Sequence, residues 1–274
     1  MPHRADLEYL ARVSAYSCQY DPRFSYFVYV PKNWLEPTRP ERYHLTVVIH
    51  GTERSAENYR NKLRDYAENT NSIILAPLFP AGLIEPRRME NYNLLRFHDV
   101  EFDVILLHMV NELGERFPIN IDDGFCLHGF SAGGQFVHRF FYLYPQHLRA
   151  VSVGAPGQVT LLDYDRPWPL GLDGIDRVFG LNPSVENMKQ VPVQIVVGSE
   201  DTYIQNPSEQ EMNRLELNQM LFNNMKSLGL DVSFDLQPEA GHNGFKVLPL
   251  VISFFKKILE IKPKQDIDEE EMRN

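Results

Sequence analysis

A short apolar stretch, a glycine-rich turn and an amphipathic helix follow one another near the middle of the chain. Residues 125–134 read FCLHGFSAGG, which contains the pattern Gly-x-Ser-x-Gly, and helical spacing follows over 135–144. This strand–turn–helix context is typical of a nucleophile elbow, a strained turn that holds a serine hydroxyl above a sheet. Gly129 and Gly133 have no Cβ, so neighbouring segments can approach the turn closely. We therefore expect Ser131 to be a nucleophile, the alternative being a glycine turn that only joins strand to helix.

Apolar strand-like runs alternate with helical stretches along almost the whole chain. The run HLTVVIH at 44–50 is closed by Gly51, as expected of a strand that is buried on both faces. The sequence predicts strands over 24–30, 44–50, 72–76, 125–127, 149–153, 193–197 and 231–236. It predicts helices over 55–69, 99–117 with Asp99 as N-cap, 135–144, 210–228 followed by Gly229, and 245–260. The alternation predicts an α/β fold with a mostly parallel central sheet and helices on both of its faces.

The same pattern predicts one domain over residues 1–261. Residues 157–190 lie between two predicted strands and are rich in Pro, Gly, Asp and aromatic residues. A connection of this length and composition is expected to cross the surface, and we interpret it as a short lid-like excursion. Residues 262–274 are charged and interrupted by proline, so we expect a flexible tail there.

Two further polar sites follow predicted strands and can complete the chemistry of a serine. A serine hydroxyl needs a base to accept its proton, and His242, in a glycine-bounded loop after the last strand, is the best candidate. The imidazole needs an acid, for which the segment VVGSED supplies Asp201 as our choice and Glu200 as its competitor. The alternative interpretation of His242 is a surface histidine, and that of Asp201 and Glu200 is a pair of solvated loop carboxylates. The chain order Ser131, Asp201, His242 is the order expected for an α/β-hydrolase.

A tetrahedral intermediate also needs N–H donors for its oxyanion. The backbone N–H of Ala132, directly after the expected nucleophile, is the first candidate. The second is the backbone N–H of Thr52, in the His-Gly-Thr turn that follows the strand over 44–50, where Gly51 permits the turn. We expect His50 to organise this loop and not to act as the base.

Several other side chains are weaker candidates for a role in the site. Tyr92, Trp168 and Tyr203 are candidates for lining an acyl or alcohol pocket, although aromatic residues more often pack in cores. Glu53 and Arg54 follow the oxyanion loop, where contact with substrate is one interpretation, but we expect both to belong to a solvated face. The histidines at 98, 108, 128 and 138 follow no metal-ligand spacing, and positions on helix or strand faces explain them as well, so no metal site is expected.

Composition bounds the class of protein and its partners. The 274 residues are 43% hydrophobic, which is enough for one large domain with a sizeable core. The formal charge of −10 makes nucleic acid an unexpected partner. Two cysteines without a CxxC pattern give no support for a metal or redox site and suit a reducing compartment. No run approaches membrane-spanning length and the N-terminus lacks a basic-then-apolar signal, so we expect a cytoplasmic protein without a membrane partner.

With these residues in place, the sequence resembles the α/β-hydrolase superfamily over nearly its full length. Within the superfamily, it is similar to the small-esterase branch that groups polyhydroxybutyrate depolymerases with feruloyl esterases. The pieces that carry the resemblance are YVP at 29–31, VVIHGT at 47–52, HGFSAGG at 128–134, VGSED at 197–201 and AGHN at 240–243.

The resemblance implies hydrolysis of a carboxylic ester through an acyl-enzyme, with Ser131, Asp201 and His242 as the triad and without a metal or organic cofactor. Extracellular polymer-degrading relatives carry a signal peptide and often binding modules, and neither is visible here. We therefore expect a small-molecule ester as substrate and a monomer or weak homo-oligomer. The superfamily also hosts amide, peptide and thioester hydrolases and non-catalytic ligand-binding proteins, which stay open as alternatives.

Overall fold

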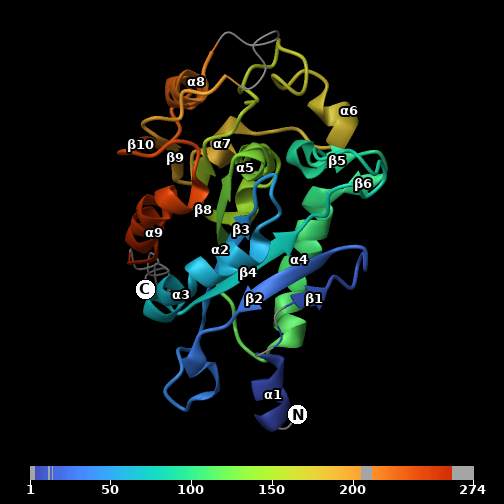
Figure 1. The fold of residues 1–274 in the computed structure, drawn as a ribbon, viewed down its shortest axis with the longest axis vertical. Helices are drawn as coiled ribbons and strands as arrows, with labels where there is room; N and C mark the ends of the chain where they lie inside the picture. Colours follow the sequence, from blue (N-terminus) through green and yellow to red (C-terminus); the bar gives the residue numbers. More distant parts are fainter. Residues whose placement is uncertain (1–3, 12, 14, 205–211, 261–274) are drawn as a thin grey trace, which may run out of the picture.

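A computed structural model of the chain describes residues 4–11, 13, 15–204 and 212–260. Its centre is an eight-stranded sheet in the order β1-β2-β4-β3-β7-β8-β9-β10 (Figure 1). The six strands from β4 to β10 in this order are parallel, while β2 pairs antiparallel with both β1 and β4. The strands of the sheet are β1 (Ala15–Ser17), β2 (Ser25–Tyr29), β3 (His44–Ile49), β4 (Ser72–Leu78), β7 (Phe125–Phe130), β8 (Leu148–Gly154), β9 (Val193–Gly198) and β10 (Val232–Gln237).

Helices lie on both sides of this sheet. Those that pack on the sheet are α2 (Ala56–Lys62), α3 (Arg64–Thr70), α4 (Phe102–Arg116), α5 (Ala132–Leu143), α8 (Arg214–Ser227) and α9 (Gly244–Glu260). Helix α3 contacts both α2 and α9, whereas α4 packs on β4, α5 on β7 and β8, and α8 on β9 and β10. The short helices are α1 (Arg4–Leu10), η1 (Lys32–Leu35), η2 (Tyr92–Leu94), η3 (Pro145–His147), α6 (Ile175–Phe179) and α7 (Val185–Met188). No helix among the described residues has the length and apolarity to cross a bilayer.

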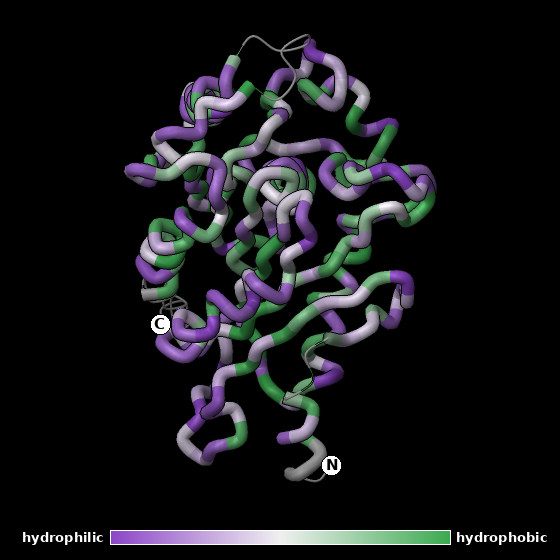
Figure 2. Tube along the Cα trace, viewed as in Figure 1, coloured by the Kyte–Doolittle hydropathy of each residue, from purple (hydrophilic) through white to green (hydrophobic). Residues whose placement is uncertain are grey.

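The central strands are covered on both faces, which explains their continuous apolar sequences. Every residue of β7 and of β9 is buried. Figure 2 shows hydrophobic residues gathered in the interior strands, with hydrophilic residues frequent on the outer helices and loops. A parallel strand between two helical layers has no solvent-facing side, so hydrophobic residues are favoured at successive positions and not only at alternate ones. The predicted α/β fold, with a mostly parallel sheet between helices, is confirmed.

Three predicted helix boundaries were wrong. The helix expected over 55–69 is divided at Leu63 into α2 and α3, and Asn71 ends the second part with a left-handed backbone at φ 50°. Asp99 is not an N-cap, because it lies in the turn of a hairpin formed by β5 (Arg96–Phe97) and β6 (Val100–Glu101), after which α4 begins. The helix expected from residue 135 begins at Ala132, directly after the turn.

One further helix start was wrong, and one predicted segment lies outside the described residues. The helix expected over 210–228 begins only at Arg214, because Asn213 is its N-cap with an extended backbone and forms a capping box with Glu216. Gly229 follows it with φ 79°, as a residue just past a helix end often does. The flexible tail expected over 262–274 lies outside the described part of the chain.

Residues 157–190, which connect β8 to β9, carry α6 and α7 and are fastened to α5 through Thr160. The backbone N–H of Thr160 donates to His138 Nε2 at 3.0 Å, and its carbonyl accepts from Tyr142 Oη at 2.8 Å. Its hydroxyl accepts from Arg139 Nε at 2.8 Å and donates to the Pro169 carbonyl at 2.6 Å. Because α5 begins at the glycine-rich turn, this connection is tied to the same helix that carries the turn (Figure 1).

We predict that Gly129→Ala lowers the free energy of unfolding by about 3 kcal/mol, the cost of overpacking a tight site. A Cβ at Gly129 would lie 2.4 Å from the carbonyl oxygen of Gly133, and neither backbone can yield easily. The control is Gly114→Ala in α4, where a Cβ meets nothing within 4 Å. That variant should gain up to about 1 kcal/mol from helix propensity. Urea denaturation measures both, and equal stability of the two variants would contradict the packing argument.

Candidate active site

The predicted site residues lie at the carboxyl ends of four parallel strands. Ser131 follows β7, Thr52 follows β3, Asp201 follows β9, and His242 lies between β10 and α9. Because parallel strands end at the same edge of a sheet, these loops converge, and this edge is where open α/β sheets bind ligands. The structure therefore brings together residues that are far apart in sequence.

Ser131 sits on a strained turn. Its backbone has φ 59° and ψ −118°, a region that non-glycine residues rarely occupy. The Ser131 N–H donates to the Gly154 carbonyl at 2.8 Å, and the Ser131 carbonyl accepts from the Gln135 N–H at 3.0 Å, which starts α5. A Cβ on Gly133 would lie 2.4 Å from the carbonyl oxygen of Ile49. The turn is thus pressed between β3 and β8, and only glycine fits at its flanks.

A hydrogen-bonded relay joins Ser131, His242 and Asp201. Ser131 Oγ lies 2.9 Å from His242 Nε2, and His242 Nδ1 lies 2.7 Å from Asp201 Oδ2. An ionised carboxylate only accepts hydrogen bonds, so Nδ1 carries the imidazole proton and Nε2 is free to accept the hydroxyl proton of Ser131. The geometry distinguishes the two candidate acids, because Asp201 is buried against the imidazole while Glu200 is exposed.

The relay is supported by packing that the sequence did not indicate. The ring of Phe130 lies 4.7 Å from the imidazole of His242, centroid to centroid, and braces its face. On the acid side, Arg214 Nη1 lies 3.5 Å from Asp201 Oδ1, and both side chains are almost fully buried. The only sequence signal for Phe130 was its place directly before Ser131. Arg214 had none, since it stands among polar residues in a predicted helix.

The loop after β3 lies against the turn, since a Cβ on Gly51 would lie 3.7 Å from the Cβ of Ser131. Among the contacts of the described residues, no acceptor is found for the backbone N–H of Thr52 or that of Ala132. Thr52 is exposed, and Ala132 is the first residue of α5, where N–H groups have no partner within the helix. The N–H of Thr52, on the loop after β3, and that of Ala132, at the start of α5, therefore stay candidates for the donors of an oxyanion hole.

Arg54 fixes this loop, which corrects the expectation that it belongs to a solvated face. Its guanidinium donates to the Thr52 carbonyl at 2.6 Å, to the Phe79 carbonyl at 3.2 Å and to the Met89 carbonyl. Its backbone N–H closes the turn by donating to the Gly51 carbonyl at 3.1 Å, and Arg54 itself has φ 57°. Burial lowers the pKa of this guanidinium. No sequence pattern marks an arginine for this role.

His50 lies beneath the same loop and is fully buried. Its Nδ1 donates to the Gly51 carbonyl at 2.8 Å, and its Nε2 accepts from the Phe79 N–H at 3.0 Å. Both ring nitrogens are engaged with backbone, and burial lowers the pKa of His50 to about 4. The imidazole is therefore neutral at pH 7 and braces the loop, in keeping with the organising role expected of it.

The three aromatic residues expected in a pocket occupy different environments. Tyr92 was a wrong expectation, because it is 1% exposed and donates its hydroxyl to the His50 carbonyl at 2.7 Å, behind the loop. Trp168 is half-buried in the connection over 157–190, where its ring lies 5.2 Å from that of Phe179. Tyr203 is 66% exposed and follows Asp201 closely in sequence.

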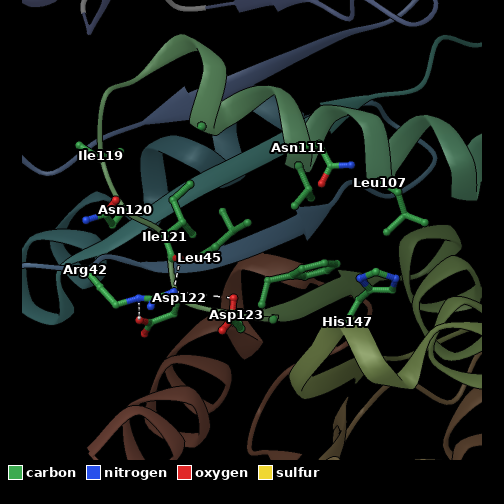
Figure 3. Close-up of a pocket in the computed structure, with 14 residues that line it drawn as sticks. Arg42, Leu45, Leu107, Asn111, Ile119, Asn120, Ile121, Asp122, Asp123 and His147 are labelled. Atoms are coloured by element: carbon green, nitrogen blue, oxygen red, sulfur yellow. Dashed lines mark hydrogen bonds and ion pairs between the residues drawn. The ribbon is translucent and has the colours of Figure 1, made fainter.

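A groove of about 540 Å³ lies at the opposite end of the sheet. Leu45 at the start of β3, Phe125 at the start of β7 and Asp122 line it together with α4 (Figure 3). Strand β7 has six residues, so its length separates this groove from Ser131 by roughly 20 Å. The groove therefore belongs to the amino edge of the sheet and contains none of the predicted site residues.

Comparison with solved structures identifies the fold, although no protein-family model and no curated protein sequence matches the chain. Poly(aspartic acid) hydrolase-1 from Sphingomonas sp. KT-1 is 19% identical with a TM-score of 0.68 over 84% of this chain and 92% of its own. The poly(3-hydroxybutyrate) depolymerase LpqC from Bordetella parapertussis is 21% identical with a TM-score of 0.68 over 85% of each chain. An S-formylglutathione hydrolase from Agrobacterium tumefaciens is 17% identical with a TM-score of 0.59, over 86% of this chain and 89% of its own.

The chain has the α/β-hydrolase fold. Its mostly parallel eight-stranded sheet with helices around it matches structural neighbours of that fold. The neighbours also include a ferulic acid esterase, so both kinds of protein in the small-esterase branch stand among them. At these identities the likeness concerns the fold, and the chemistry is argued from the site itself.

We predict that the protein loses stability as the pH falls from 6.5 toward 4. His50 and His128 are buried, and burial lowers the pKa of each to about 4. Below pH 6.5 the unfolded chain binds protons that the folded chain does not, so each histidine should cost on the order of 2–3 kcal/mol of unfolding free energy at pH 4.5.

Urea denaturation at pH 7 and at pH 4.5 measures this loss. The variant His128→Asn should lose less between the two pH values than the unaltered protein, because one titrating group is gone. His98→Gln, at an exposed and paired histidine, serves as the control and should lose as much as the unaltered protein. Equal losses in all three proteins would show that His128 does not contribute to the loss of stability at low pH.

Proposed function

We propose that the chain is a serine hydrolase of the α/β-hydrolase type that cleaves a small carboxylic ester through an acyl-enzyme on Ser131. The observation that carries this proposal is the relay of 2.9 Å and 2.7 Å hydrogen bonds from Ser131 through His242 to the buried Asp201. A relay of this kind is what converts a weakly nucleophilic hydroxyl into an attacking group. The hydrolases and esterases among the structural neighbours support the same class.

In the first half of the proposed reaction, Ser131 Oγ attacks the acyl carbonyl and His242 Nε2 takes the hydroxyl proton. Asp201 holds the imidazole with Nδ1 protonated and stabilises the imidazolium that forms. The backbone N–H groups of Thr52 and Ala132 donate to the oxyanion of the tetrahedral intermediate. When this intermediate collapses, the bond to the alcohol oxygen breaks and His242 returns the proton to the leaving alcohol. The acyl group then remains on Ser131.

The second half repeats the same steps with water. His242 Nε2 accepts a proton from a water molecule, whose oxygen attacks the acyl carbonyl on Ser131. The intermediate collapses with return of that proton to Ser131 Oγ, and a carboxylic acid leaves. The residues named here supply every proton transfer and all the charge stabilisation that the two steps need, so the proposed reaction requires no metal or organic cofactor.

We predict that Ser131→Ala lowers kcat/KM for short p-nitrophenyl esters by at least about 10⁴-fold while the fold is kept. The same substitution should abolish covalent labelling by a fluorophosphonate probe, which reacts with an activated serine. Ser233→Ala, at an exposed serine on β10, is the matched control and should leave labelling and turnover unchanged. Labelling or turnover that survives in Ser131→Ala would overturn the assignment of the nucleophile, and an unlabelled native protein would favour a ligand-binding role.

We predict that a p-nitrophenyl ester is turned over at least about 100-fold faster than the p-nitroanilide of the same short acyl group. A phenolate leaves without protonation, whereas a leaving amine needs a positioned acid, which is worth about that factor. The measurement is kcat/KM for the two substrates with one preparation of the protein. Comparable values would replace the ester proposal by an amide hydrolase, the chemistry suggested by the name of the poly(aspartic acid) hydrolase among its structural neighbours.

A further inference from the structure

The second carboxylate oxygen of Asp201 faces a buried cation. Oδ2 bonds to His242, whereas Oδ1 is buried and makes no hydrogen bond within the described residues. Arg214 Nη1 nevertheless lies 3.5 Å from Oδ1, so the two groups form an ion pair without hydrogen-bond geometry. The Asp201 side chain is fully buried and that of Arg214 is 6% exposed, so little water screens the attraction.

Arg214 is held in place by its backbone. It is the first residue of α8, whose start is fixed by the capping box between Asn213 and Glu216. The Arg214 N–H also donates to the Tyr203 carbonyl at 3.2 Å, which closes the chain back onto the segment that follows Asp201. Burial lowers the pKa of the Arg214 guanidinium, while the Asp201 charge raises it. An arginine shifted in this way keeps its charge at neutral pH.

Among the other titratable groups on the neighbouring elements, Arg54 on the loop after β3 is half-buried and donates its guanidinium N–H groups to backbone carbonyls of its own loop and of the segment after β4. The remaining groups are exposed or stay neutral. Burial raises the pKa of the Tyr59 phenol, which lies beneath Gly244, so this group is uncharged at neutral pH. Arg214 is thus the buried charge that faces the relay from outside it, within the described part of the chain. The exposed groups are Glu53 on the loop after β3, Glu200 and Tyr203 beside Asp201, Glu239 and Lys246 beside His242, and Glu216 on α8.

We propose that Arg214 is a positioning residue whose positive charge lowers the pH at which the Asp201–His242 pair takes up a proton. The two groups of the pair share their titration, and a proton on either of them is repelled by a fixed cation beside the carboxylate. The charge therefore keeps the imidazole neutral, and able to accept the Ser131 proton, in more acidic solution. This role rests on the proposed function and extends it to the pH range in which the site works.

Removal of the charge gives the first test. In Arg214→Met the titration midpoint of the His242 imidazole should rise by about one pH unit, the order of effect of one nearby charge. NMR follows the imidazole C–H resonance, which is identified by its loss in His242→Gln. The midpoint at which kcat/KM falls on the acidic side of its pH profile should shift to higher pH by the same amount. If the Met variant does not fold, Arg214→Gln removes the same charge with a polar side chain, and the same shift is expected.

Two matched variants separate charge from packing. Arg214→Lys keeps the charge, and because the native contact lacks hydrogen-bond geometry, its midpoint should stay within roughly 0.3 of a pH unit of the native one. Arg149→Met removes one positive charge at the start of β8, where Arg149 pairs with Asp122 at 2.8 Å at the far edge of the sheet. Its midpoint should not move, since the charge is distant and partly exposed.

The outcomes are distinguishable from those that test the proposed function. An unmoved imidazole midpoint in a folded charge-removing variant overturns the role of Arg214, and so does an equal shift in Arg214→Lys or Arg149→Met. The imidazole titration needs no substrate, so it decides this role whether or not turnover is detected. Absence of fluorophosphonate labelling at Ser131 overturns the proposed hydrolase instead, whatever the titration shows.

Discussion

The backbone of Ser131 is the constraint on which the site depends. A residue at φ 59° and ψ −118° stores about 1–3 kcal/mol of strain and persists only where its surroundings leave no alternative. The surroundings here are backbone atoms: Gly133 rests on the end of β3, and Gly134 approaches the Gly154 carbonyl at the end of β8. The turn is therefore held by the sheet, and the hydroxyl and the start of α5 are fixed together.

The same kind of backbone contact sets the positions of the acid and the base. A Cβ on Gly198, at the end of β9, would lie 2.2 Å from the Ala240 carbonyl, so the loop that carries Asp201 is packed against the loop that carries His242. The Glu200 N–H donates to that same carbonyl at 2.8 Å. The short distances of the relay thus follow from strand ends locked to one another, which lowers the entropy that would be lost in assembling the site.

The sequence was sufficient where local pattern decides structure. The buried strands could be predicted because a strand covered on both faces needs apolar residues throughout, and Ser131 and Asp201 could be proposed because each follows such a strand. His242 could be proposed from its glycine-bounded loop after the last strand, although β10 is a partly exposed edge strand. The helix break at Leu63 and the β5–β6 hairpin could not, since both depend on contacts with distant segments. Arg54 and Arg214 were missed for the same reason, because a buried cation is recognisable only from the acceptors that surround it.

Arg139 on α5 holds the connection over 157–190 against the helix that begins at the turn. It is fully buried, and its guanidinium bonds to neutral oxygens: the Thr160 hydroxyl at 2.8 Å, the Asn93 carbonyl at 2.7 Å and Gln158 Oε1 at 3.2 Å. Burial lowers its pKa to about 9, so the cation persists at neutral pH. A buried charge is destabilising unless all of its donors make hydrogen bonds. Moving Thr160 away from α5 would leave the buried Arg139 guanidinium without one of its acceptors and would therefore be unfavourable. The part of the connection around Thr160 is therefore a fixed wall beside the helix that begins at Ser131.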